Sequence, residues 1–256
     1  MDIKFLGAHH SETETTGCIC LLINDNLAID AGSLTSTLSI SNQQKIEAIL
    51  LSHQHYDHIR DVPSIALNLS YHGSSIDVYA TPEVSAVIET HLLNGIIYPK
   101  FHELPPAKPT IQFKLITPYE TSRFNGYQIL AVPVNHGDTT VGYQISDAEG
   151  KSMFYTADTG PNLLDCWQHV SPQLLITDVT MPDRYGEFAR RTGHLTPSLL
   201  GEELATFRKL KGYLPQVITV HMDATLEQEI KNEIATVAET LNATISAAYE
   251  GMKVHI

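Results

Sequence analysis

The feature that most constrains this chain is a run of four potential metal ligands within six residues. The side chains are His53, His55, Asp57 and His58, and they directly follow the apolar segment 46–51. Polar clusters at the end of a buried strand are typical of functional sites. Alternation along an extended chain places His53 and His55 on one side, and a turn into a following helix lets the other two point elsewhere. The spacing therefore predicts two adjacent metal ions, one for each pair.

The ligand types narrow the choice of metal. Imidazole and carboxylate suit zinc, manganese or iron, and the absence of a nearby cysteine argues against a structural thiolate site. A single histidine at such a strand–helix turn is more often an ordinary surface residue. Three other apolar strand-like segments run into a polar residue that can ligate, namely His136, Asp158 and His221. Each alone is typical of a loop, but together they supply the missing ligands for two metals, with Asp158 as the bridge.

The charge balance excludes several classes of partner. The 256 residues contain 16 Lys and Arg against 29 Asp and Glu, a formal charge of −13 with histidine neutral. This balance argues against sequence-blind binding of long nucleic acid or anionic lipid, because both require clustered Lys and Arg. A small anionic substrate is still compatible with it where metal ions supply positive charge. The hydrophobic fraction of 43% is typical of a globular protein with a substantial core.

The cysteines and the N-terminal residues bear on where the protein is located. Cys18, Cys20 and Cys166 do not form a disulfide framework, and small buried hydrophobes are the better interpretation. The first residues lack a basic segment followed by an apolar one. No apolar run approaches the roughly 20 residues that span a bilayer. We therefore expect a cytoplasmic protein without a membrane segment.

The hydrophobic patterning predicts an α/β (α+β) protein with a single domain over residues 1–256. Asn24-Asp25-Asn26 is typical of a hairpin turn. One helix is predicted to open at Thr196-Pro197 and run to Gly212, and a last helix to span about 225–241. Strands are predicted at 3–6, 18–23, 27–30, 46–51, 129–134, 141–145, 153–156, 174–177, 217–220 and 244–248.

The regular pattern of apolar segments is interrupted between residues 84 and 127. A short helix over 82–93 gives way to segments that contain Gly, Pro and the aromatic residues Tyr98 and Phe101. This composition is typical of a lid or a substrate loop. The two rings are expected either to stack on a substrate or to pack the lid itself.

With the ligands in this order, the sequence resembles the metallo-β-lactamase superfamily. The similarity extends from the opening hairpins to the closing Tyr249-Glu250-Gly251-Met252. The resemblance implies a four-layer αββα sandwich with ligands on loops along one edge. It also implies the following assignment: a first metal on His53, His55 and His136, a second on Asp57, His58 and His221, and Asp158 as the bridging ligand.

A second motif, Gly193-His194-Leu195-Thr196-Pro197, points to one branch of that superfamily. It resembles the histidine motif of the ribonuclease Z-like and class II cyclic-nucleotide phosphodiesterase branch, in which the histidine donates a proton or contacts the scissile phosphate. By itself the motif fits equally well a histidine that precedes a helix cap. The sequence lacks a recognisable Gly- and Lys-rich inserted arm, with which ribonuclease Z grips tRNA. Asp57-His58 together with Asp158 disfavours β-lactam hydrolysis as the main activity.

We therefore expect a hydrolase with two divalent ions, zinc first and manganese or iron as alternatives, that cleaves a small phosphodiester such as a cyclic nucleotide through a metal-bridging hydroxide. Asp57 is expected to orient the nucleophile and His194 to protonate the leaving alkoxide. Arg184, Arg190 and Arg191 are candidates for a phosphate clamp, although each is more often a solvated arginine. The alternatives are a hydrolase of a lactone, thioester or sulfate ester, a ribonuclease Z-like nuclease, and a non-hydrolytic iron-binding redox or sensor module. The sequence leaves open whether the chain forms a homodimer.

Overall fold

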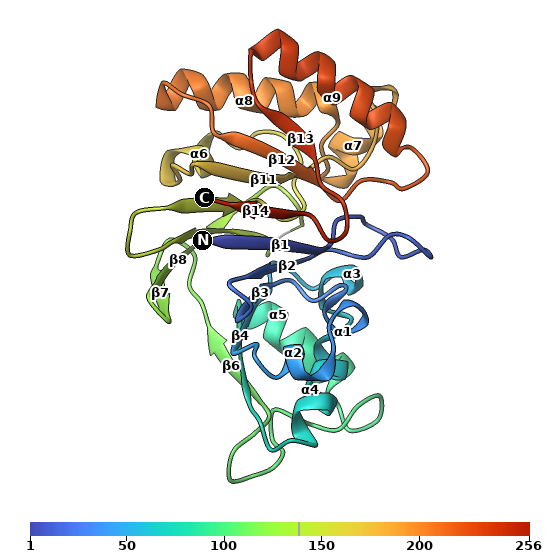
Figure 1. The fold of residues 1–256 in the computed structure, drawn as a ribbon, viewed down its shortest axis with the longest axis vertical. Helices are drawn as coiled ribbons and strands as arrows, with labels where there is room; N and C mark the ends of the chain where they lie inside the picture. Colours follow the sequence, from blue (N-terminus) through green and yellow to red (C-terminus); the bar gives the residue numbers. More distant parts are fainter. Residues whose placement is uncertain (138) are drawn as a thin grey trace. The chain divides into compact units, whose positions relative to one another are not determined.

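The computed structural model describes residues 1–137 and 139–256, and the chain divides into two compact units. The first unit comprises residues 1–7, 12–117 and 250–255, and the second comprises 8–11, 118–249 and 256. In Figure 1 the first unit is coloured blue to green, with the red strand β14 added from the C-terminal end of the chain. Each unit contains a mixed sheet, its own helices and its own apolar core.

The sheet of the first unit has the strand order β14-β1-β2-β3-β4-β5-β6 over the described residues. Neighbours from β14 to β3 are antiparallel, and those from β3 to β6 are parallel. Asn24 and Asp25 in the β2–β3 turn have φ of 44° and 60°, the conformation that suits a tight hairpin. The strands are β1 Asp2–Gly7, β2 Cys20–Ile23, β3 Leu27–Ile29, β4 Ala48–Leu50, β5 Ile76–Ala80, β6 Ile111–Leu115 and β14 Lys253–His255.

Short helices pack against this sheet and enclose an apolar core. The longest of them, α4, buries Ile65, Ala66 and Leu69 against strand residues such as Ile49 and Val78. The helix predicted at 82–93 is present in two pieces, because α5 continues as a π-helix after Val87. The helices are α1 Leu34–Thr37, α2 Ile40–Gln43, α3 Tyr56–Ile59, α4 Val62–Ser70, α5 Pro82–Val87 and the π-helix η1 Ile88–Leu92.

The stretch predicted to be a lid, 84–127, is irregular only in its middle. Strands β6 and β7 lie within it, which the sequence pattern did not indicate. Phe101 is only 6% exposed and belongs to the core, and Tyr98 packs against that core. The two rings therefore serve packing, while Ile96 at the tip is 88% exposed. A lid function for this stretch stays a prediction.

The sheet of the second unit has the order β13-β12-β11-β10-β9-β8-β7 over the described residues. Here β7 to β10 are antiparallel neighbours and β10 to β13 are parallel. Every residue of β11 is buried, as is typical of a central strand that is covered on both faces. The strands are β7 Thr121–Phe124, β8 Tyr127–Pro133, β9 Val141–Ser146, β10 Ser152–Tyr155, β11 Leu174–Asp178, β12 Gln216–Val220 and β13 Ile245–Ala247.

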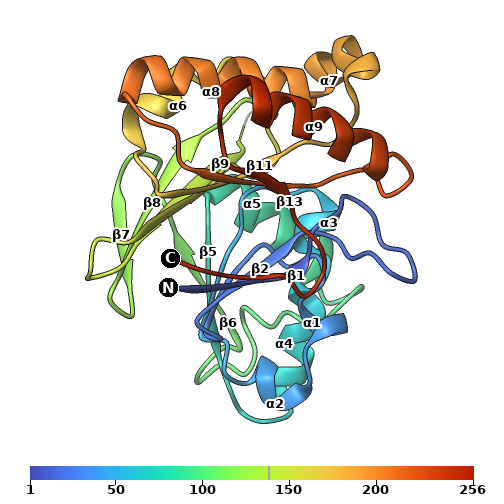
Figure 2. The same cartoon turned by 45° about the horizontal axis from the view of Figure 1, so that its top comes forward.

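Two long helices, α8 and α9, cover one face of β11–β13 (Figures 1 and 2). Helix α8 has the predicted bounds: the Thr196 side chain accepts from the Leu199 N–H at 3.4 Å, Pro197 follows, and Gly212 ends the helix with φ of 81°. The helices are α6 Leu164–His169, the 3-10 helix η2 Asp183–Tyr185, α7 Gly186–Thr192, α8 Pro197–Lys211 and α9 Glu227–Leu241. None of the helices in the described ranges is long and apolar enough to cross a membrane.

Candidate metal centre

In the first unit, the four predicted ligands follow β4 and enter α3. His53 and His58 are almost completely buried, His55 is exposed as the N-cap residue of α3, and Asp57 lies in the first turn. The ligating atoms of His53 and His55 lie within 4.8 Å of one another, and so do those of Asp57 and His58. The rings of His53 and His58 are 4.2 Å apart between centroids. Both pairs are thus arranged so that each can share one metal ion.

A buried aspartate, Asp30, holds these histidines from behind. His58 Nδ1 lies 2.7 Å from Asp30 Oδ2, and the Ser52 hydroxyl donates to the same oxygen at 2.9 Å. His53 Nδ1 lies 3.0 Å from that hydroxyl oxygen. Because a carboxylate only accepts, both histidines carry a hydrogen on Nδ1 and present the lone pair of Nε2. Asp30 was not identified from the sequence, although it directly follows the apolar strand β3, as the predicted ligands His136, Asp158 and His221 follow apolar segments.

In the second unit, three predicted ligands follow β8, β10 and β12. Asp158 Oδ2 lies 3.2 Å from His221 Nε2 and 3.8 Å from His136 Nε2. All three side chains are at most 5% exposed. Strands β8, β10 and β12 run in the same direction, so their carboxyl ends meet at one edge of the sheet. The sheet topology places Asp158 between the two histidines.

The backbone is unusual where it delivers these ligands. His221 has φ of 66°, Ala157 next to Asp158 has φ of 59°, and Asp30 has φ of 55°. A side chain other than glycine adopts this left-handed region only at a free-energy cost, and such residues concentrate at functional sites. Each of the three lies within two residues of the end of a strand. The turns there aim side chains outward from the sheet edge.

His194 lies beside these ligands in the second unit and is held by Asp178, the last residue of β11. Its Nδ1 donates to Asp178 Oδ2 at 2.8 Å. The Thr180 hydroxyl donates to Asp178 Oδ1 at 2.6 Å and lies 2.8 Å from His221 Nδ1. The rings of His194 and His221 are stacked with centroids 5.3 Å apart. One buried carboxylate therefore orients both a predicted ligand and the predicted proton donor.

Asp178 and Thr180 were not identified from the sequence. Asp178 is the last residue of an apolar strand, and Asp30 directly follows one. A polar residue at the end of an apolar segment was therefore visible in the sequence at both positions. Ligating atoms of Asp178, His194 and His221 also lie within 4.8 Å of one another. Because Asp178 and His194 already share a short hydrogen bond, this trio is better suited to orienting the histidines than to binding a further ion.

The donor set fits divalent metal ions. His136 Nδ1 donates to the Gly193 carbonyl oxygen at 2.8 Å, so its Nε2 carries the lone pair. The same tautomer follows for His53, His58 and His221 from their Nδ1 partners. Neutral imidazoles fixed in this way, together with two carboxylates, form the nitrogen and oxygen ligand sets that zinc, manganese and iron accept.

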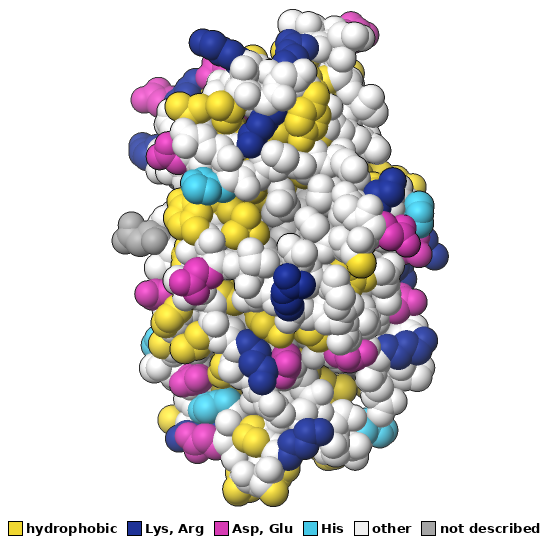
Figure 3. All heavy atoms as spheres, turned by 90° about the vertical axis from the view of Figure 1, so that its left-hand side faces the viewer, with side chains coloured by type: hydrophobic (Ala, Val, Ile, Leu, Met, Phe, Trp, Pro, Cys, Tyr) yellow, Lys and Arg dark blue, Asp and Glu magenta, His cyan; other side chains and the backbone are white. Residues whose placement is uncertain are grey.

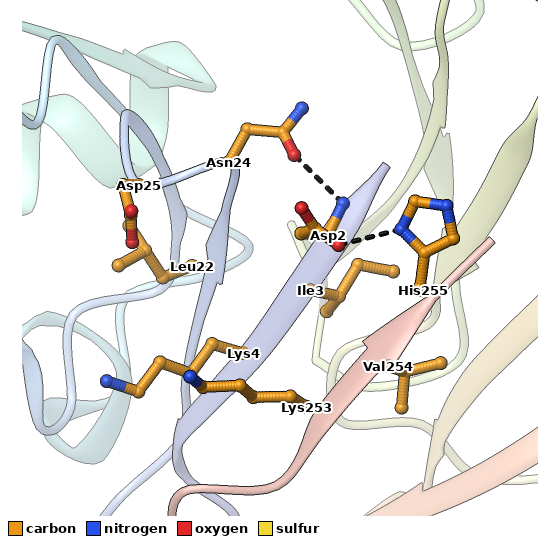
Figure 4. A pocket seen from close by; sticks show the side chains of 9 residues that line it. All are labelled: Asp2, Ile3, Lys4, Leu22, Asn24, Asp25, Lys253, Val254 and His255. Atoms are coloured by element: carbon orange, nitrogen blue, oxygen red, sulfur yellow. Dashed lines mark hydrogen bonds and ion pairs between the residues drawn. The ribbon is translucent and has the colours of Figure 1, made fainter.

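A cavity of about 570 Å³ lies elsewhere in the first unit, at the β14-β1-β2 end of the sheet (Figure 4). Lys4 and Lys253 face one another across β1 and β14, and His255 Nδ1 lies 2.7 Å from Asp2 Oδ1. The hydrogen bond to His255 is the main reason that the pKa of Asp2 is lowered. None of the predicted ligands lines this cavity, whose mixed charges do not form a metal site.

Comparisons with known proteins agree with this arrangement. A family model described as a beta-lactamase superfamily domain matches residues 28–222, which is 195 of the 256 residues. Ribonuclease Z of Methanococcus maripaludis is 24% identical over 227 residues, covering 83% of this chain and 71% of the relative. Unliganded yeast PDE1 has a TM-score of 0.83 at 16% identity, with 100% of this chain and 99% of that chain covered. Zinc-bound PqqB of Methylobacterium extorquens has a TM-score of 0.71 at 15% identity, with 100% of both chains covered.

The chain belongs to the β-lactamase superfamily, and its fold is the metallo-β-lactamase fold. The resemblance drawn from the ligand pattern is confirmed, as is the αββα fold class that it implied. The class of protein is a metal-dependent hydrolase. The histidine and aspartate clusters imply divalent metals as its cofactors.

Proposed function

We propose that the ligands of the two units together bind two divalent ions, with zinc as the physiological metal. His53, His55 and His136 hold one ion, Asp57, His58 and His221 hold the other, and Asp158 bridges them. The observation that carries this proposal is the set of buried histidines, each fixed through Nδ1 so that Nε2 is the ligand. Two bound divalent ions would activate water and neutralise charge on a substrate ester.

The reaction proposed for this site is hydrolysis of a phosphodiester. His194 donates a proton to the leaving oxygen, a step to which metal ions contribute little. Its Nδ1–H is fixed on Asp178 at 2.8 Å, so the ring presents Nε2 to the substrate. The buried carboxylate also stabilises the positive ring that carries the second proton. Asp57, in the first turn of α3, is half-exposed and can orient the attacking oxygen.

The size of the substrate is the finer question. On the face drawn in Figure 3, Lys and Arg side chains are interspersed with Asp and Glu and do not form a strip. Together with the net charge of −13, this distribution favours a short phosphodiester over a long duplex. RNA is the second candidate substrate, because the curated relatives that match the chain are named ribonuclease Z.

A substrate panel on metal-defined protein tests the proposal. We expect hydrolysis of bis(p-nitrophenyl) phosphate and of a cyclic or linear nucleotide diester, lost with chelator and restored by zinc. Preferential cleavage of a lactone, thioester or sulfate ester would replace the phosphodiester proposal and leave the metal assignment intact. Bound iron with no hydrolysis on the whole panel would support the redox or sensor alternative.

A further inference from the structure

An exposed group of arginines and aromatic rings lies on η2 and α7, directly before His194. Tyr185 is 40% exposed and Phe188 is 47% exposed. The Arg184 guanidinium carbon is 4.9 Å from the centre of the Tyr185 ring, and that of Arg191 is 5.4 Å from the centre of the Phe188 ring. Tyr185, Phe188 and Arg191 are spaced three residues apart, so they lie along one side of the helix. We name these three residues the α7 stripe.

The segment that carries the stripe, residues 184–191, is rich in arginine although the protein is acidic. Three of the six arginines of the chain lie within residues 184–191. Arg184 pairs with Glu229 at 3.0 Å, and Arg190 lies 3.5 Å from Glu202. For Arg191, no carboxylate of the described residues lies within 4.0 Å, and its guanidinium contacts only the Phe188 ring face among charged and aromatic groups. Of the three candidates from the sequence, Arg191 is therefore the one positioned to bind an external anion.

The end of helix α7 is hydrogen-bonded to two residues of the proposed site, His194 and His136. Gly193 ends it with φ of 74°, and the N–H of His194 donates to the Ala189 carbonyl oxygen at 2.9 Å. The carbonyl oxygen of Gly193 itself accepts from His136 Nδ1. Arg191, the last residue of the stripe, precedes His194 by three residues in the sequence. A ligand bound on the stripe would therefore be held on the helix that leads directly into His194, the proposed proton donor.

We propose that the α7 stripe binds the nucleotide next to the scissile phosphate, with a base on the rings and a neighbouring phosphate on Arg191. This inference rests on the proposed function and names its substrate class as a short single-stranded oligonucleotide. Aromatic faces bind any base by stacking, and a guanidinium binds phosphate in a bidentate manner. An arginine that lies over an exposed ring adds a cation–π contribution to both interactions. A partner that is merely apolar would leave Arg191 without a counter-charge.

A measurement of RNA binding tests the proposal for the α7 stripe independently of hydrolysis. A fluorescein-labelled single-stranded RNA of five nucleotides is titrated with protein in chelator, and anisotropy is read. We expect Phe188→Ala and Arg191→Ala each to raise Kd about 10-fold, and Phe188→Trp to restore tight binding. Lys253→Ala, which removes one cation from the cavity of Figure 4, is the matched control and should leave Kd unchanged. Arg191→Ala should also reduce the slope of log Kd against log salt concentration by the amount expected for about one phosphate contact.

Turnover separates this inference from the proposed function. With zinc present, the ratio of kcat/KM for a dinucleotide diester to that for bis(p-nitrophenyl) phosphate should fall about 10-fold in Phe188→Ala and in Arg191→Ala. Unchanged RNA affinity in both variants, or no RNA binding by the wild type, overturns the stripe even where the aryl diester is hydrolysed. Stripe-dependent RNA binding without hydrolysis of any diester would uphold the stripe as a nucleotide-binding surface and refute the proposed function.

Discussion

The two units differ in how the chain delivers the proposed ligands. The first unit takes four of them from one six-residue run between β4 and α3. The second takes three from the ends of separate strands spread over residues 136–221, and sets His194 among them from the start of another helix. Both units nevertheless place a buried aspartate, Asp30 or Asp178, behind the histidines. In a local run, the spacing of the ligands is set by the chain itself. The relative positions of dispersed ligands depend instead on the register of the strands that carry them.

The second unit combines two tasks, metal binding and proton donation, whereas the first unit is proposed to bind metal only. Asp30 contacts His58, a proposed ligand, and Ser52, whose hydroxyl in turn contacts the proposed ligand His53. Asp178 touches a proposed proton donor and, through Thr180, a proposed ligand. We therefore expect metal binding to depend on both units, and proton transfer to depend on the second unit alone.

Removal of a ligand should have the largest effect. His53→Ala in the first unit and Asp158→Ala in the second should each release metal and reduce activity to near background. Metal content by mass spectrometry and kcat on bis(p-nitrophenyl) phosphate are the measurements. His72→Ala, an exposed histidine of the first unit, is the control that retains both. Two retained metal equivalents in Asp158→Ala would contradict its role as the bridge.

His194→Ala should lower kcat about 10²- to 10⁴-fold on a diester with an alkyl leaving group, because the alkoxide then leaves without a proton. The loss should be smaller with p-nitrophenolate, which leaves readily unprotonated. Metal content should stay at the wild-type value, because His194 is not one of the seven proposed ligands. An equal loss on both leaving groups would refute the acid role and leave only a binding role.

The two buried aspartates should have intermediate and distinguishable effects. Asp30→Asn should weaken metal affinity about 10- to 100-fold, because it disturbs the Nδ1 partner of His58. Asp178→Asn should produce a similar loss of affinity and also make kcat sensitive to the leaving group, as His194→Ala does. Competition with a chromogenic chelator and the leaving-group series measure the two effects. Equal leaving-group sensitivity in both variants would contradict the division of tasks between the units.

The smallest expected difference between the two units is in the reactivity of their cysteine thiols. Burial raises the pKa of Cys18 in the first unit to about 11, and it raises the pKa of Cys166 in the second unit further. At pH 8 only about a thousandth of Cys18 is therefore thiolate, and its labelling rate should rise tenfold per pH unit below 11. Disulfide-exchange labelling should be slow in the native protein, with Cys18 ahead of Cys166. Cys18→Ser should abolish the faster phase and retain metal.

Much of the local structure was predictable from the sequence because its causes are local. Thr196-Pro197 and Gly212 bound α8, since capping and φ preferences act within a turn. The Asn24-Asp25 turn marked the first hairpin for the same reason. Strands β5, β6, β7 and β14 were not predicted, because short segments such as Thr121–Phe124 carry little apolar periodicity and depend on pairing with neighbours.

The sequence by itself determined the kinds of ligand and their order along the chain, because side-chain chemistry and the spacing of His53 to His58 are covalent properties. Only the tertiary structure decided which groups orient them. Asp30 and Asp178 gain their positions from strand pairing and burial, which bring residues far apart in the sequence within hydrogen-bond distance. It also decided that Phe101 packs in the core and that Arg191, among three arginines, forms no ion pair with a carboxylate of the described residues. These outcomes depend on neighbours in space, and neighbours in space are not encoded by spacing along the chain.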